Sequence, residues 1–144
     1  SNAHVGREFE QRVFDYFKRE IPDLRLNFPI EVGHSQKKSH SYDLGSETEK
    51  VIIECKSHTW TKGNNVPSAK LTTWDQAMLY FFLSPKIYRK MFVVVRDVNE
   101  RTNETLLAYY LRLHGHLIPE GVEFWEWDAE YPVLFPKGQW KKLS

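Results

Sequence analysis

The apolar residues at the start of the chain follow two kinds of spacing, one helical and one extended. Between Val5 and Glu20 they recur every three or four residues with charged residues between them, which predicts an amphipathic helix that ends at Ile21-Pro22-Asp23. From Leu24 to Val32 apolar and polar residues alternate instead, which predicts a strand with one buried face. Pro29 has no N–H for a neighbouring strand, so we expect it on an edge strand or at a bulge.

The next segment predicts two further strands. Gly33 to Ser41 is polar and is expected to form a loop or hairpin arm, followed by a short strand around Tyr42 to Leu44 and a turn near Gly45 to Lys50. Val51 to Ser57 is predicted to be a strand. Its side chains divide between two faces, with Val51, Ile53 and Cys55 on one and Ile52, Glu54 and Lys56 on the other.

The rest of the chain predicts two helices and two strands. After a polar loop from His58 to Pro67, a helix is expected to start at Ser68, or at a capping box led by Thr72 or Thr73, and to end near Leu83. Met91 to Val98 has the continuous apolar character of a strand buried on both faces. A third helix is predicted over roughly 103 to 113, a late strand over 122 to 127 and irregular structure over 128 to 144.

These elements make the predicted fold class α/β, with a mixed central β-sheet flanked by helices. Their order is helix, three strands, helix, strand, and then helix, strand. A length of 144 residues with 41% hydrophobic residues fits a single domain over residues 4–144. Ser1-Asn2-Ala3 resembles the scar of a cleaved expression tag, and because no methionine follows it, one interpretation is a fragment of a longer protein with partner domains outside it.

Charge and cysteine content exclude several classes of protein. The 20 basic and 19 acidic residues leave a net charge of +1, which excludes a uniformly basic nucleic-acid coat and limits nucleic-acid contacts to local patches. The single cysteine, Cys55, excludes an intramolecular disulfide and favours a reducing, cytoplasmic setting. No apolar segment approaches the roughly 20 residues of a membrane-spanning helix, so no membrane partner is expected.

Asp43 and the Glu54-Cys55-Lys56 segment lie on either side of a short turn. Folding the chain back near Thr48 and Glu49 as an antiparallel hairpin sets Asp43 opposite Glu54. Directly opposed residues have side-chain roots about 5 Å apart, so both carboxylates can ligate one hard divalent cation such as Mg²⁺ or Mn²⁺. A slip of one residue would turn one carboxylate to the other face of the sheet.

Lys56 is predicted on the same face of its strand as Glu54. A metal ion at the two carboxylates can polarise a phosphodiester oxygen and lower the pKa of a bound water. The Lys56 ammonium can orient that water or help to deprotonate it, and it offsets negative charge in the transition state. The predicted chemistry is therefore the hydrolysis of phosphate esters.

With these motifs in this order, the sequence resembles the PD-(D/E)XK, or restriction-endonuclease-like, nucleases. Tyr42-Asp43 and Glu54-Cys55-Lys56 match the two motifs of that family, with Tyr42 in place of a proline that is not a ligand. Gly6-Arg7-Glu8-Phe9-Glu10 is similar to a first-helix pattern of Mrr-like and Holliday-junction-resolvase-like members. Gln76 to Tyr80 is similar to a Gln-x-x-x-Tyr motif on the helix after the third strand of some relatives. The resemblance covers Gly6 to about Val98.

The resemblance implies a restriction-endonuclease-like core and a nuclease that depends on Mg²⁺ or Mn²⁺ and cleaves phosphodiester bonds, in DNA rather than RNA. Its catalytic residues would be Glu10, Asp43, Glu54 and Lys56. The metal ligands would be Asp43, Glu54, the backbone carbonyl of Cys55 and Glu10, with Glu8 a weaker candidate for the first-helix acid. Because one such centre cuts one strand, a duplex break implies a homodimer or a recruited partner.

Candidate nucleic-acid contacts flank these residues. Lys37 and Lys38 on one side and Lys62 on the other can follow a phosphate backbone, while Trp60 stacks on a base or ribose. Gln76 and Tyr80 lie one helical turn apart and share a face. These two residues either contact a nucleotide or serve to cap and pack the helix.

Each assignment has a plainer alternative. Glu54 and Lys56 could form an ion pair on a solvated sheet face, and Glu10 could be a solvated helix residue. Cys55 is expected to be a buried core thiol. His58, two residues beyond Lys56 on the same face, either reaches the site or is a loop residue. As a whole, the chain could be a catalytically silent nucleic-acid-binding or interaction module of the same fold. It could also be an unrelated α/β binding domain, in which Asp43, Glu54 and Lys56 would not converge.

Overall fold

The computed structural model describes residues 2–135 and has an α/β fold. The predicted order of helices and strands is confirmed, with a short 3-10 helix and one strand added near the end. The elements are α1 (Asn2–Lys18), β1 (Arg25–Val32), β2 (Lys38–Ser46), β3 (Val51–Lys56), α2 (Ser68–Leu83), β4 (Arg89–Val95), α3 (Leu106–His114), η1 (Gly115–Leu117), β5 (Val122–Asp128) and β6 (Tyr131–Leu134).

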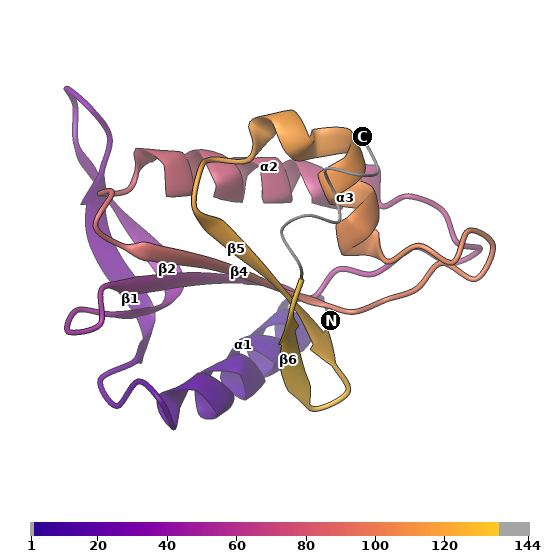
Figure 1. The fold of residues 1–144 in the computed structure, drawn as a ribbon, viewed down its shortest axis with the longest axis horizontal. Helices are drawn as coiled ribbons and strands as arrows, with labels where there is room; N and C mark the ends of the chain where they lie inside the picture. The colour runs from indigo at the N-terminus through magenta and orange to yellow at the C-terminus, as the bar shows by residue number, and fades with distance from the viewer. Residues whose placement is uncertain (1, 136–144) are drawn as a thin grey trace.

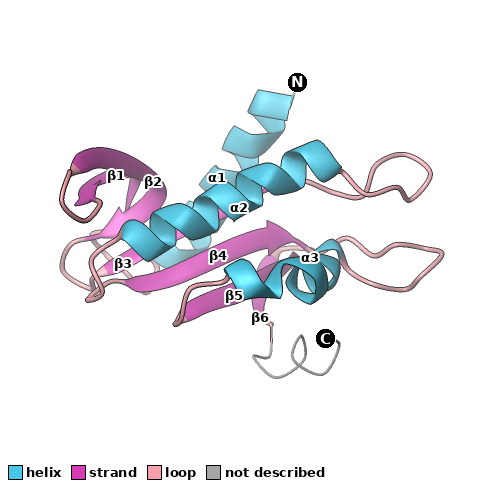
Figure 2. Cartoon of the chain, turned by 90° about the horizontal axis from the view of Figure 1, so that it is seen from above, coloured by secondary structure: helices cyan, strands magenta, loops and turns pink. Residues whose placement is uncertain are grey.

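The strands of the described residues form one mixed six-stranded sheet in the order β1-β2-β3-β4-β5-β6. β1, β2 and β3 are antiparallel neighbours, β3, β4 and β5 run parallel, and β5 and β6 are antiparallel. Figure 1 shows α1 on one face of this sheet and α2 and α3 on the other, and Figure 2 shows the same layers from above. The predicted mixed sheet flanked by helices is therefore confirmed, and β1 is an edge strand, as Pro29 indicated.

An apolar layer fills each side of the sheet. Under α1, Phe9 and Val13 pack with Leu44 of β2 and Ile53 of β3. The layer under α2 and α3 is built mainly of aromatic side chains that contact one another, among them Trp74, Phe81, Phe92 and Tyr110. β4 contributes to both layers, as its continuous apolar sequence predicted, because Met91 and Phe92 point to opposite faces. The two layers fix the central strands that carry Asp43 and Glu54.

Strand β2 changes face at Asp43. Tyr42 belongs to the layer under α2 and Leu44 to the layer under α1, although residues two apart in a regular strand share a face. The register of β1 sets Asn27 between the pairs Phe28↔Tyr42 and Leu26↔Leu44, and Asn27 has a φ of 55°. This left-handed residue marks a local twist of the β1–β2 ribbon, which leaves Asp43 at the boundary between the two apolar layers.

Two strands depart most from the prediction, and β4 is shifted to Arg89–Val95 from the predicted 91–98. β2 begins at Lys38 rather than at Tyr42, because its polar first residues pair with β1 through backbone bonds that do not depend on side-chain polarity. β6 lies within a segment predicted to be irregular and pairs with β5, including Trp127↔Pro132. Residues 136–144 of that segment lie outside the described residues.

The helix starts also differ in detail. α2 begins at Ser68 without a side-chain cap, and the hydroxyls of Thr72 and Thr73 donate backwards to carbonyls within the helix, so neither forms the alternative capping box. α3 begins at Leu106 rather than near residue 103, because the Thr105 hydroxyl accepts the N–H of Ala108 at 3.1 Å and caps the helix there. No helix of the described residues is long and apolar enough to cross a membrane.

Candidate active site

Asp43 and Glu54 face each other where β2 and β3 stop pairing. The ladder between these strands runs from Ser46↔Val51 to Leu44↔Ile53, which is the register predicted from the turn, so Asp43 and Glu54 form the next opposed pair. The backbone N–H of Asp43 donates to Oε1 of Glu54 at 3.0 Å, and the N–H of Cys55 donates to Oδ2 of Asp43 at 2.8 Å. Each carboxylate therefore accepts a backbone N–H of the opposite strand.

These reciprocal bonds orient both carboxylates toward the space between the strands. A backbone N–H in a strand has a fixed position, so each bond holds the carboxyl oxygen that accepts it in place. Glu54 is only 8% exposed and Asp43 is half-buried. The prediction that Asp43 lies across from Glu54 is confirmed.

Glu10 approaches the same place from α1. It follows the buried Phe9, and its pKa responds to the charges of both Asp43 and Lys56. Glu8 instead pairs with His4 at 3.0 Å on an exposed part of the helix. Of the two first-helix acids, Glu10 is the one that lies within electrostatic range of Asp43.

Lys56 stands at the end of β3, two residues beyond Glu54 and half-buried. Its positive charge lowers the pKa of Glu10, Asp43 and Glu54. The salt bridges found among residues 2–135 do not include a Glu54–Lys56 pair. A direct ion pair on a solvated face is therefore not the arrangement of these two residues.

The acids of this cluster resist ionisation. Burial raises the pKa of Glu54 to about 8, and the charge of Asp43 adds to the rise. Burial and the charge of Asp43 likewise raise the pKa of Glu10 to about 7, against the opposing effect of Lys56. Burial also raises the pKa of Asp43, although the Cys55 N–H and Lys56 oppose it. One lysine does not balance three acids, so the cluster favours an added proton or cation.

The donor set at this position fits a hard divalent cation. Asp43, Glu54, Glu10 and the Cys55 carbonyl supply only oxygen atoms, which Mg²⁺ and Mn²⁺ prefer. Burial and, after it, the charge of Asp43 raise the pKa values of Glu54 and Glu10, and a bound cation would favour the ionised form of both acids. Among residues 2–135, no three side chains of histidine, cysteine, aspartate or glutamate form a ready-made metal site. The two opposed carboxylates, Asp43 and Glu54, are therefore the primary candidate ligands.

The Cys55 thiol belongs to the core. It lies in the apolar layer under α1 with Val51 and Ile53, as the alternation of β3 predicted. Burial, followed by the negative charges of Asp43 and Glu54, raises the pKa of this thiol. A protonated and buried thiol is a poor nucleophile, so Cys55 contributes to the site through its backbone.

The predicted basic residues Lys37 and Lys38 are near the C-terminal end of α2, far from the start of that helix. They are exposed at the tip of the β1–β2 hairpin, where Lys37 donates to the Gly33 carbonyl at 2.9 Å. The Gly33 N–H donates to the carbonyl of Leu83, which places this tip at the C-terminal end of α2 (Figure 1). Lys62 is exposed in the loop that leads into the N-terminal end of α2, so these lysines mark opposite ends of the molecule.

Trp60 is part of the core rather than of the surface. Its side chain is 9% exposed, its indole N–H donates to the Asp97 carbonyl at 3.1 Å, and its ring meets Tyr109 edge-on. Trp60 also borders the pocket beyond the end of β3, but a side chain that is only 9% exposed offers little surface for stacking. We therefore do not propose that Trp60 stacks on a base.

Gln76 and Tyr80 have different surroundings although they share a helix face. Gln76 is exposed, whereas Tyr80 stacks on His40 of β2 with ring centroids 3.7 Å apart. The Tyr80 carbonyl accepts the Tyr42 hydroxyl at 2.6 Å. Tyr80 thus joins α2 to the strand that carries Asp43, while Gln76 stays open to solvent.

Comparisons of the chain with protein-family models, curated proteins and solved structures found no match.

Proposed function

We propose that this protein is a metal-dependent nuclease that hydrolyses phosphodiester bonds in DNA. The observation that carries the proposal is the reciprocal pair of bonds between Asp43 and Glu54, which holds the half-buried Asp43 and the buried Glu54 together beside Lys56. Two opposed acids and a lysine two residues further on are the combination that the PD-(D/E)XK motifs imply. The element order up to β4 agrees with the core of that superfamily, and we propose that the chain has this restriction-endonuclease-like core.

In this proposal each side chain has a separate task. Asp43 and Glu54 bind the cation, together with the Cys55 carbonyl, and Glu10 adds a ligand or holds a water next to it. When bound, Mg²⁺ or Mn²⁺ would supply Lewis-acid polarisation of the phosphodiester. Lys56 lies near all three acids and is positioned to orient the attacking water and to offset charge on the phosphate.

The proposal is tested by incubating supercoiled plasmid and short single-stranded DNA with the protein in Mg²⁺, in Mn²⁺ or in EDTA. We expect cleavage that requires the metal and that falls at least about 100-fold in the Lys56→Ala variant, since removing one such electrostatic group typically costs about that much. Lys86→Ala provides a matched control, because Lys86 is exposed beyond the other end of α2.

Two results would contradict the proposal. Metal-dependent cleavage that is equally strong in Lys56→Ala would place the activity elsewhere or in a contaminant. Binding of DNA without cleavage in any metal would favour a catalytically silent binding module of the same fold.

A further inference from the structure

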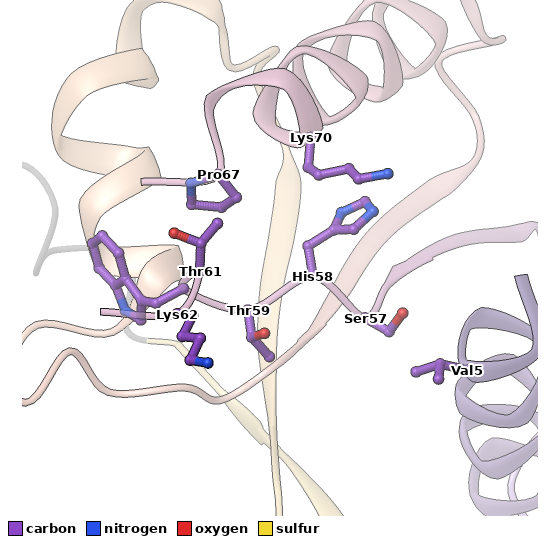
Figure 3. A pocket seen from close by; sticks show the side chains of 9 residues that line it. Val5, Ser57, His58, Thr59, Thr61, Lys62, Pro67 and Lys70 are labelled. Atoms are coloured by element: carbon purple, nitrogen blue, oxygen red, sulfur yellow. The ribbon is translucent and has the colours of Figure 1, made fainter. Parts of the chain in front are cut away.

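A pocket of about 470 Å³ lies directly beyond the end of β3. Its wall is formed by the loop that follows Lys56 and by the first turn of α2, with Val5 of α1 at one side (Figure 3). The polar groups come mainly from Ser57, His58, Thr59, Lys62 and Lys70. A volume in this range is typical of small-ligand sites, and its position next to Lys56 sets it beside the proposed centre.

His58 presents an N–H donor in this pocket. Its Nδ1 lies 2.9 Å from the indole nitrogen of Trp74, which is a donor only, so Nδ1 accepts and the ring proton of the neutral imidazole is on Nε2. Trp74 is fully buried, so this partner is fixed in the core. Burial, followed by the charges of Lys56 and Lys70, lowers the pKa of His58 to about 4. His58 therefore remains a neutral donor at physiological pH.

The pocket favours an anion. Lys70 and Lys62 are the charged residues among its described lining, and none of that lining is acidic. Figure 3 shows the Lys70 side chain reaching over the His58 ring, so that the ammonium and the imidazole lie close together. A neutral N–H donor, an ammonium group and hydroxyl groups can all donate hydrogen bonds to the oxygen atoms of a phosphate.

The loop that forms the pocket is held in place by the loop after β4. The Trp60 N–H donates to Oδ2 of Asp97 at 2.9 Å, and the Asn99 side chain donates to the Asn64 carbonyl at 3.0 Å. The two loops lie side by side beyond the ends of the parallel strands in Figures 1 and 2. These bonds already order the loop in the free protein. Binding therefore costs little further conformational entropy of the loop, as expected of a preformed site.

We propose that this pocket binds one phosphate of a nucleic-acid strand next to the phosphodiester that is cleaved, through His58 Nε2–H and Lys70. The identity of the ligand as a nucleic-acid strand rests on the function proposed above. Anchoring a neighbouring phosphate would fix the register of the strand over Asp43 and Glu54, which is the role that phosphate contacts have in nucleic-acid recognition.

The test is a metal-free titration, so that it does not depend on turnover. In EDTA, pentathymidylate with or without a 5′-phosphate is added to ¹⁵N-labelled protein while the imidazole signals of His58 are followed by NMR. We expect the His58 Nε2–H signal to move on saturation. In Lys70→Ala we expect roughly 3- to 10-fold weaker binding and a salt dependence reduced by about 0.7 in the log–log slope, the loss of one phosphate contact to a single strand.

Lys86→Ala is the matched control and should leave both the affinity and the slope unchanged. Tighter binding of the 5′-phosphorylated strand would identify a terminal phosphate, and equal binding would identify an internal one; both results support the site. An unchanged His58 signal in a saturated complex would overturn it, as would equal effects of the two lysine variants or the absence of binding. A shifted His58 signal in a protein that cleaves nothing would refute the nuclease and keep the phosphate site.

Discussion

Glu54 and Glu10 oppose folding at neutral pH when no metal is bound. Their pKa values in the folded protein are about 8 and about 7, both above the ordinary value of a glutamate. Between those values and about pH 4.5 these two groups bind more protons in the folded protein than in the unfolded chain. By linkage, these two glutamates make the free energy of unfolding fall as pH rises through this window, whereas His58, with its pKa lowered to about 4, makes it rise up to the ordinary pKa of a histidine.

We predict that Glu54 lowers the stability of the metal-free protein at pH 8 relative to pH 5 by on the order of 2 kcal/mol after allowing for its coupling to Asp43, measured as the difference in pH dependence between the natural sequence and Glu54→Gln. Urea unfolding in EDTA at the two pH values measures this difference. Glu54→Gln, which keeps a neutral side chain of similar size, should flatten the dependence. An equally steep fall in the variant would show that other groups cause it.

Mg²⁺ should restore stability at pH 8 in the natural sequence, because an ion that binds only the folded state stabilises it.

The residue types of the site could be predicted from the sequence, but their bonds could not. Asp43, Glu54 and Lys56 followed from a turn of fixed length and the two-residue period of a strand. The exchange of backbone N–H groups and carboxylates depends on the strands separating after Leu44↔Ile53, which no local pattern indicates. The hydrogen bond between His58 and Trp74 joins a loop to a helix 16 positions away, and no sequence pattern links these two residues.

At the scale of the elements, the β1–β2 ribbon depends on a glycine, Gly45, against which the Phe28 ring packs. A Cβ added at Gly45 would lie 2.3 Å from ring atoms of Phe28, whose side chain is buried in the layer under α2. Such contact is impossible without a shift of the ribbon, and overpacking of this kind typically costs about 1 to 3 kcal/mol. We therefore predict that Gly45→Ala destabilises the protein by about that amount in urea unfolding.

Gly6→Ala is the matched comparison and should act in the opposite direction. Gly6 lies within α1, and its added Cβ would meet only Ser57 Oγ at 4.0 Å. Alanine in a helix interior is favoured over glycine by about 0.5 to 1 kcal/mol. Destabilisation by both variants to the same extent would mean that the close approach to Phe28 is not the reason for Gly45.

The strand segments that the sequence did not predict are held only by backbone hydrogen bonds to a neighbouring strand. Tyr131, Val133 and Leu134 of β6 are exposed and flank a proline, so the segment lacks the alternation of a half-buried strand. Its regular conformation comes from its bonds to β5. The same holds for the first residues of β2, which are polar and pair with β1. Segments with a regular pattern of buried side chains were predictable, and segments held only by backbone pairing with a neighbouring strand were not.

For the whole molecule, the candidate residues divide between two ends of α2. Lys37 and Lys38 lie at the hairpin tip near its C-terminal end, and Lys62 and Lys70 lie near its N-terminal end with the phosphate pocket (Figure 1). The opposed acids lie on the central strands between these ends. A strand bound in the proposed pocket and over the acids would thus meet Lys62 and Lys70, while Lys37 and Lys38 would lie toward the other end of α2.

A single such centre has consequences for the products. If each chain carries one centre and cuts one strand, plasmid cleavage must proceed through nicked circles, and linear DNA must come from a second event opposite the first.

We predict that at low protein concentration nicked circles accumulate, with a rate proportional to protein concentration. Linear DNA should appear with a steeper, near second-order dependence, since two chains have to act within a few base pairs. Initial rates of both products over a series of protein concentrations, read from agarose gels, measure the two orders. Linear DNA formed without a nicked intermediate, at a rate proportional to protein concentration, would contradict the single-strand mechanism and would instead indicate a stable pair of centres that acts on both strands at once.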